Sequence, residues 1–386
     1  MAKHTIIIIG TGAIARVHIE AYKKIGGCRI VGLCDLFVEK AEHLIEEMEL
    51  QGAVAYKDYK EALASSDADI VSVCLPPGLH AQIAIDALLS GKHVLVEKPM
   101  ATSLEECDRM IEAGKKSGKL LSIVCQNRFK TPMMKMKQLL DSDHLGRVRY
   151  ANINSYWWRG QSYYDLWWRG TWENESGGCT TGHATHHIDL MQWLLGMPTE
   201  VTAVISNMVH TNSECEDLSM AIFRYPDKMV QLTATLLMHG EEQSMVFSAD
   251  KAKVSIPWSV SANKELENGF PIEDAETQDT VQSYYDSLPD LDLEGHPAQI
   301  RNFIRAIDGK EELLVTGEEG RKTIELIMAI YKSSVTQAPV QLPLAKDDVF
   351  YTKAGLVSQM PKFFEKKRSV ENFTTDKISL GRDVGK

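Results

Sequence analysis

Apolar residues in the first third of the chain fall in short unbroken runs, separated by longer stretches that carry an apolar stripe. Such runs are typical of parallel strands buried on both faces, and the stripes are typical of the helices that cover them. We predict strands at Ile6–Ile9, Ile30–Cys34, Val54–Tyr56, Ile70–Leu75, His93–Glu97 and Leu120–Cys125. We predict helices at Val38–Met48, Tyr59–Ala64, Leu79–Leu89 and Leu104–Lys116. This alternation predicts an α/β domain with a doubly wound parallel sheet.

From Arg147 onward, apolar and polar residues alternate instead, which is typical of strands with one solvated face. Strands are predicted at Val148–Tyr156, Val201–Val209, Leu218–Tyr225, Met229–Leu237, Ser244–Ala249 and Ala252–Ile256. Helices are predicted at Thr131–Leu140, His183–Leu195, Pro297–Ile307 and Glu318–Lys332. The second domain should therefore be α+β, with a large, mostly antiparallel open sheet.

These patterns divide the 386 residues into a first domain (1–127), a second domain (128–343) and a C-terminal extension (344–386). Residues 261–295 hold many acids and little apolar periodicity, so we expect a long surface excursion there. The extension is polar and charged. It is expected either to be solvated or loosely docked, or to embrace another subunit.

A glycine turn follows the first strand directly. Gly10 permits a tight turn, Gly12 lets a ligand approach the backbone, and Ala15 is small enough for close packing of helix and strand. A pyrophosphate lies well against such a turn, because the N–H groups of the next helix point at it. The residues predicted to bind this dinucleotide are Gly10, Thr11, Gly12, Ala13 and Ile14.

Asp35 ends the second strand, where a carboxylate accepts hydrogen bonds from the adenosine ribose. Its charge would repel a 2′-phosphate, and Leu36, Phe37 and Val38 follow it without an arginine. The cofactor is therefore predicted to be NAD rather than NADP.

Composition narrows the choice of partners. The net charge is −11 with no long basic tract, so no nucleic-acid partner is expected. No apolar run approaches the ~20 residues that cross a bilayer, and the start of the chain does not resemble a signal peptide, so we expect a cytoplasmic protein without membrane contact. The seven cysteines are scattered, which is typical of buried thiols in a reducing compartment.

Two further segments follow predicted parallel strands, at the sheet edge where such domains bind ligands. The first runs from Leu75 and Pro76 to His80, and the second contains Glu97, Lys98 and Pro99. Together with other motifs, these segments make the chain resemble the Gfo/Idh/MocA oxidoreductases up to about Ser334. The other motifs are the glycine turn, Asp35, Gln126-Asn127-Arg128-Phe129, and the later Gly177-Gly178 with His186-His187-Ile188-Asp189.

The resemblance implies roles for several residues. It places Lys98 and His186 as acid–base groups at the polar end of the substrate pocket, beside the nicotinamide. It implies that Leu75, Pro76, His80, Glu97, Lys98, Asn127, Trp168 and Arg169 border the cofactor. It also implies self-association, as a dimer or tetramer, through the open sheet of the second domain.

One position departs from the family pattern. Many members have an aspartate four residues before the histidine that matches His186, and this chain has Gly182 there. Either His183 replaces the missing carboxylate, or Lys98 and His186 work without a third partner.

The spacing Cys179-x-x-x-His183-x-x-x-His187 also fits one face of a helix and ligands that suit zinc. We expect no metal, because the neighbouring glycines disfavour a helix and a fourth ligand is not assignable.

Aromatic residues are dense between Tyr156 and Trp172. Aromatic faces pack on the C–H faces of sugar rings, and arginines bind hydroxyls or a carboxylate. We expect Arg159, Tyr164 and His183 to bind substrate together with Lys98 and His186.

Two activities fit these residues. The first is an NAD-dependent dehydrogenase of a secondary hydroxyl in a sugar, cyclitol or glycoside, with the 3-hydroxyl of glycosides as one candidate. The second is a redox-neutral glycosidase or lyase that oxidises its substrate transiently. An NAD-sensing or scaffold protein is a third possibility that Lys98 and His186 argue against.

Overall fold

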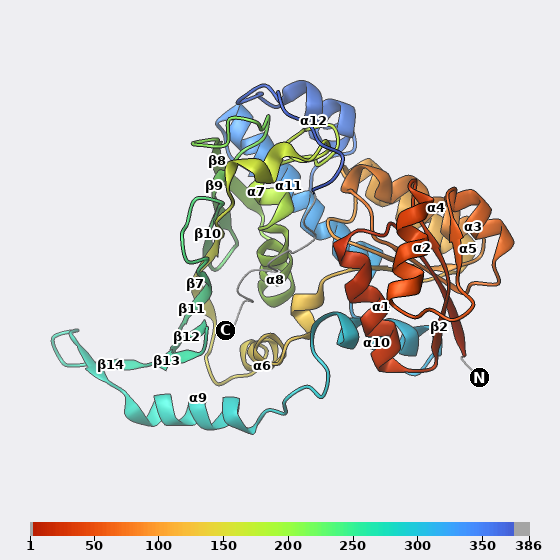
Figure 1. Ribbon diagram of the computed structural model, residues 1–386. Helices are drawn as coiled ribbons and strands as arrows, with labels where there is room; N and C mark the ends of the chain where they lie inside the picture. The colour runs from red at the N-terminus through yellow and green to blue at the C-terminus, as the bar shows by residue number, and fades with distance from the viewer. Residues whose placement is uncertain (1–2, 374–386) are drawn as a thin grey trace.

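The computed structural model describes residues 3–373, which form two sheets with helices packed between and around them (Figure 1). The N-terminal sheet has six parallel strands in the order β3-β2-β1-β4-β5-β6. These are β1 (His4–Ile9), β2 (Cys28–Cys34), β3 (Val54–Tyr56), β4 (Ile70–Val73), β5 (His93–Val96) and β6 (Leu121–Ile123). The predicted doubly wound sheet is confirmed, and its order reverses between β1 and β4.

Burial on both faces explains the apolar run of β1. Ile6 and Ile8 point into one hydrophobic core, and Ile7 and Ile9 point into another on the opposite face. The covering helices are α1 (Ala13–Ile25), α2 (Val38–Glu47), α3 (Tyr59–Ser65), α4 (His80–Leu89) and α5 (Leu104–Ser117).

The second sheet has eight strands in the order β13-β12-β11-β7-β10-β9-β8-β16. They are β7 (Val148–Tyr156), β8 (Glu200–Ser206), β9 (Leu218–Arg224), β10 (Met229–Thr235), β11 (Gln243–Ala249), β12 (Lys253–Ile256), β13 (Ser259–Ser261) and β16 (Val340–Gln341). The pair β7 and β10 is parallel and the other neighbours are antiparallel, as the alternating pattern predicts.

One face of this sheet is covered by helices and the other is open (Figure 1). The helices of this domain are α6 (Thr131–Leu140), α7 (Cys179–Gly182), α8 (Thr185–Leu195), α9 (Ala275–Ser287), α10 (Gly295–Ile307) and α11 (Gly317–Thr336), and α12 (Lys353–Gln359) follows in the C-terminal extension. α11 packs on β8 and α8, whereas α10 returns to the first sheet and packs on α1. The predicted helix at His183–Leu195 is wrong at its start, since the short α7 ends at Gly182 and α8 begins at Thr185.

The surface excursion predicted at 261–295 is confirmed, since most of these residues are exposed, but the regular structure inside it was not predicted. This segment forms the hairpin β14 (Asn263–Glu265) and β15 (Pro271–Glu273), followed by α9 (Figure 1). The Asp274 side chain caps α9 by accepting from Thr277 N. Only Val281 of this helix is fully buried, so the sequence offers almost no apolar stripe to predict it.

The described part of the C-terminal extension is firmly docked rather than loose. It contains a short 3₁₀ helix (Val349–Tyr351) and α12. Its buried side chains are Leu344, Phe350, Tyr351, Leu356 and Met360. The rest of the predicted extension, residues 374–386, lies outside the described residues. Within residues 3–373, no helix is long and apolar enough to span a membrane.

Candidate active site

A cavity of about 1750 Å³ lies between the two sheets, at the carboxyl ends of β1, β4 and β5. This is the point where the strand order of the first sheet reverses, the usual ligand site of doubly wound domains. The first domain contributes the loops that follow these strands. The second domain contributes α8 and the aromatic wall, which is the cavity-lining part of the aromatic segment between Trp157 and Arg169. The site is therefore built from both domains.

The glycine turn fits a dinucleotide. Gly10 has φ +95°, and a Cβ there would overlap the carbonyl oxygen of Cys74, so a side chain is excluded. A Cβ on Gly12 would have no neighbour within 4 Å, which leaves the backbone open to the cavity. Thr11, Ala13 and Ile14 line the cavity beside the two glycines. A pyrophosphate can thus lie against the first turn of α1.

Asp35 is tied to the same turn. Its Oδ2 accepts hydrogen bonds from Thr11 N at 3.0 Å and Thr11 Oγ1 at 2.7 Å, and its Oδ1 accepts from Phe37 N at 3.0 Å. The carboxylate also lines the cavity. Its position beside the glycine turn fits the adenosine ribose of a bound dinucleotide.

Two of the residues expected to border the cofactor lie behind the lining instead. Leu75 and Pro76 line the cavity, but the His80 ring is buried between two carbonyls, with Nε2 2.7 Å from Leu75 O and Nδ1 2.8 Å from Pro99 O. His80 therefore joins the loops after β4 and β5. Asn127 is buried in a 3₁₀ helix (Gln126–Phe129), and its neighbour Gln126 lines the cavity.

Lys98 reaches the cavity from the end of β5. Its Nζ donates to the carbonyl oxygen of Gly182 at 3.2 Å, across the domain boundary. Burial lowers the pKa of Lys98 below its ordinary value, although the negative charge of Glu97 opposes this. The lowered pKa makes the amine of Lys98 a better proton acceptor than an exposed lysine at the same pH.

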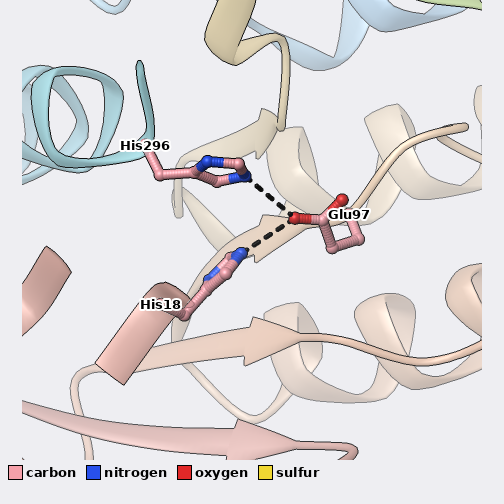
Figure 2. Close-up of side chains that lie close together, drawn as sticks. All are labelled: His18, Glu97 and His296. Carbon is pink, nitrogen blue, oxygen red and sulfur yellow. Dashed lines mark hydrogen bonds and ion pairs between the residues drawn. The ribbon is translucent and has the colours of Figure 1, made fainter. Parts of the chain in front are cut away.

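Glu97 is held by two histidines that the sequence analysis missed (Figure 2). His18 Nε2 of α1 lies 2.9 Å and His296 Nε2 of α10 lies 3.5 Å from Glu97 Oε1, while Oε2 accepts from Lys98 N at 3.2 Å. Burial alone would raise the pKa of Glu97, but the contacts with His18 and His296 outweigh it and hold the pKa well below its ordinary value. The carboxylate therefore stays charged beside Lys98.

Of the three neighbouring histidines His183, His186 and His187, two lie at the cavity. His186 and His183 line it, and burial lowers the pKa of both well below the ordinary value, with Lys98 adding to the effect. Both imidazoles are therefore neutral at pH 7. The His183 ring packs on Trp157 and Tyr163, with centroids 5.3 and 5.5 Å apart.

The three residues of the possible zinc site do not converge. Cys179 Sγ contacts Ala234 O at 3.6 Å in the core, and His187 is fully buried on α8, where burial lowers its pKa to about 3. Among residues 3–373, the only cluster of three metal-ligating side chains is the His18, Glu97 and His296 group, in which Glu97 and His18 are already hydrogen-bonded.

Glu175 is the main site residue that the sequence analysis missed. It is buried, lines the cavity, and accepts from Gly170 N at 2.6 Å and from Arg169 Nη1 at 3.3 Å. A Cβ on Gly182 would lie 3.4 Å from Glu175 Oε1, so the glycine leaves room for this carboxyl. Burial raises the pKa of Glu175 to about 7, although Arg169 opposes the shift.

The aromatic segment splits between the cavity and the core. Its cavity-lining members are Trp157, Trp158, Arg159, Tyr163, Trp167, Trp168 and Arg169. The guanidinium of Arg169 lies over the rings of Tyr163 and Trp168, 4.2 and 4.3 Å from their centroids, and Arg159 pairs with Glu241.

The expectation that Tyr164 binds substrate is not met by its position. Tyr164 is fully buried behind the wall and packs edge-on against His210, with centroids 5.1 Å apart. It supports the wall and does not line the cavity.

Family comparisons agree with this architecture. Residues 4–124 match the model of an oxidoreductase family with an NAD-binding Rossmann fold, and residues 137–342 match the model of its C-terminal α/β domain. The chain belongs to the Gfo/Idh/MocA oxidoreductase family. Its cofactor is NAD.

Individual relatives span almost the whole chain. D-glucoside 3-dehydrogenase of Escherichia coli is 24% identical over 87% of this chain and 97% of that protein. Myo-inositol 2-dehydrogenase of Thermotoga maritima is 23% identical over 87% and 97%. The structure of the WlbA dehydrogenase of Bordetella pertussis, solved with NADH and UDP-GlcNAcA, is 28% identical, covers 89% of this chain and all of that one, and superposes with a TM-score of 0.75.

Proposed function

We propose that this oxidoreductase oxidises a secondary hydroxyl of a sugar, cyclitol or glycoside with NAD. The observation that carries the proposal is the convergence of Lys98, His186 and Glu175 on one cavity that also contains the glycine turn and the aromatic wall. When bound, NAD supplies the acceptor for the hydride that leaves the substrate carbon. The residues of this chain must bind the alcohol, orient it and take its proton.

Lys98 and His186 are the proposed acid–base pair. Both are partly buried at the cavity, and burial lowers the pKa of both, which shifts each toward its uncharged form. An uncharged amine or imidazole can accept the hydroxyl proton as the C–H bond breaks.

Glu175 is proposed as the third member, in place of the aspartate that the family pattern has at position 182. It lies against Gly182, whose carbonyl oxygen accepts from Lys98 Nζ. Since its pKa of about 7 lets it gain or lose a proton near neutral pH, it is suited to receive the proton from Lys98 or to return it. His183 then serves as a neutral hydrogen-bonding group for the substrate.

The wall favours a carbohydrate. Trp157, Tyr163 and Trp168 offer apolar faces for the C–H side of a ring, and Arg159 and Arg169 offer hydrogen-bond donors for hydroxyls or a carboxylate. The relatives named above act, by their names, on a glucoside and on an inositol. Oxidation at the 3-hydroxyl of a glycoside is the specific reaction we propose.

A screen of glycosides and cyclitols with NAD tests the proposal. A steady rise of NADH absorbance with one substrate is expected, and no turnover of any sugar, cyclitol or glycoside would contradict it. Release of the aglycone should be measured in parallel. Aglycone release without net NADH would favour the alternative, a redox-neutral glycosidase or lyase that oxidises its substrate transiently.

We also propose that the open face of the second sheet mediates self-association, as a dimer or a dimer of dimers. Neighbouring strands expose large apolar side chains on this one face: Tyr150, Val204, Met220, Ile222 and Met229. A patch of this kind on a sheet is typical of a protein interface.

A further inference from the structure

The C-terminal extension returns to the cavity. The family match ends at residue 342, so this part of the chain adds to the shared architecture. After α12, residues 366–373, here called the C-terminal strap, run along the second domain. Its cavity-lining residues are Ser369, Glu371, Asn372 and Phe373.

The strap is anchored to the second domain by backbone hydrogen bonds. Val370 forms a parallel bridge with Leu166: Val370 N donates to Asp165 O at 2.8 Å, and Trp167 N donates to Val370 O at 2.9 Å. The buried Asn212 side chain accepts from Lys367 N and Arg368 N at 2.8 and 2.9 Å. These contacts fix the strap beside Trp167, at the rim of the aromatic wall.

The other end of the strap contacts the first domain. Asn372 Oδ1 accepts from Lys40 Nζ of α2 at 2.8 Å, and the Lys40 ammonium lies over the Phe37 ring, 4.7 Å from its centroid. Phe37 N in turn donates to Asp35 Oδ1. The strap thus bridges the two domains next to Asp35.

We propose that residues 369–373 are part of the dinucleotide site, where they cover the adenosine end of NAD and slow its release. The inference rests on the assignment of Asp35 to the adenosine ribose. The Asn372 amide and the Glu371 carboxylate offer hydrogen bonds to amino and hydroxyl groups, and Phe37 and Phe373 offer aromatic faces for a base. Release at this end requires the contact of Asn372 with Lys40 to break.

Release of NADH measures this directly and needs no sugar substrate. Three chains are compared: the full chain, a chain that ends at Phe373, and a chain that ends at Arg368. Each is loaded with NADH and mixed with excess NAD, and the loss of bound-NADH fluorescence is followed by stopped flow. We expect release from the chain ending at Arg368 to be about tenfold faster or more, the factor that corresponds to the loss of one or two hydrogen bonds. The chain ending at Phe373 should match the full chain.

Full-length variants keep the test valid if the short chain does not fold. Val370→Pro removes the donor to Asp165, and Asn372→Ala removes the acceptor for Lys40, so both should accelerate release. Equal release rates in all chains and variants would overturn the proposal, as would fast release from the chain ending at Phe373, because retention would then belong to residues 374–386. Asp35→Ala separates the two assignments. Weaker NADH binding is expected, and unchanged binding would refute the adenosine assignment and the strap proposal together.

Discussion

The two walls of the cavity are built from different materials. The first domain presents the backbone of a glycine turn and the first turn of α1, together with a few charged side chains, Asp35, Glu97 and Lys98. The second domain presents large side chains, several of them charged and paired, such as Arg169 with Glu175. Backbone groups cannot be changed without changing the fold, whereas side chains can be replaced one at a time. The cofactor wall is therefore fixed by architecture, and the substrate wall is open to changes of specificity and of mechanism.

The largest expected effect separates chemistry from cofactor binding. Lys98→Met and His186→Ala should each lower kcat by about 10²–10⁴-fold, the usual worth of positioned acid–base catalysis. NAD affinity should change little, because the glycine turn and Asp35 remain intact. Steady-state kinetics and NADH binding are the measurements. Near-normal turnover in Lys98→Met would show that the proposed mechanism is wrong.

Glu175→Gln tests the contribution of one side chain of the second domain to the mechanism, because it removes a charge and keeps the size of the side chain. In the unmodified protein, oxidation should decline as pH falls through about 7, since Glu175 becomes protonated and can no longer accept a proton. The variant should be slower by about 10–100-fold and should lose this part of the pH profile. An unchanged profile would remove Glu175 from the proton path. His183→Ala is the matched comparison and should have a milder effect, since Glu175, not His183, fills the space at Gly182.

Glu175→Gln should slow catalysis, but it should raise the free energy of unfolding at neutral and alkaline pH relative to the unmodified protein. The pKa of Glu175 is raised in the folded state, so the folded protein loses stability relative to the Gln variant as pH rises from about 4.5 to about 7. Between pH 5 and pH 8 the stability of the variant relative to the unmodified protein should rise by up to about 3 kcal/mol. Denaturant unfolding at pH 5 and pH 8 measures this, and a difference that does not grow with pH would contradict the assigned pKa.

A smaller effect is expected at the cofactor wall. Asp35→Ser should narrow the preference for NAD over NADP by about tenfold, because it removes a charge that repels the 2′-phosphate. The ratio of kcat/KM for the two cofactors is the measurement. Equal efficiency with both cofactors in the unmodified protein would refute the predicted preference.

The last prediction concerns the oligomeric state and lies far from the cavity, so no effect on catalysis is expected from it. Ile222→Asp places a charge in the middle of the exposed apolar face of the second sheet and should yield monomers. Leu89→Asp, at a comparably exposed position on α4, should leave the assembly unchanged. Light scattering at micromolar concentration reports the mass, and a monomeric unmodified protein would contradict the proposed interface.

Sequence reasoning succeeded where the determinants are local. Thr131–Leu140 and Val148–Tyr156 were predicted with the bounds that the structure has, because their patterns are strong and turns flank them. The glycine turn and Asp35 were placed together because strand, turn and acid follow one another within one βαβ unit.

Sequence reasoning failed for residues whose role depends on tertiary contacts. Glu175 stands in no motif, and its character comes from Gly170, Arg169 and the space above Gly182. Tyr163 and Tyr164 are adjacent and equally aromatic, yet one lines the cavity and the other lies in the core. No property of the isolated sequence distinguishes them.

The group of His18, Glu97 and His296 has a consequence for how the chain is assembled. His296 lies in the first turn of α10, which belongs to the second domain in sequence but packs on α1 of the first. The helix brings Ile300 and Phe303 into the core that contains Ile6 and Ile8. A fragment of residues 1–127 would leave that hydrophobic surface bare and Glu97 without one of its histidines. The core of the nucleotide-binding half is therefore completed by a helix from the far end of the second domain, and a nascent chain can complete it only after about 300 residues have been synthesised.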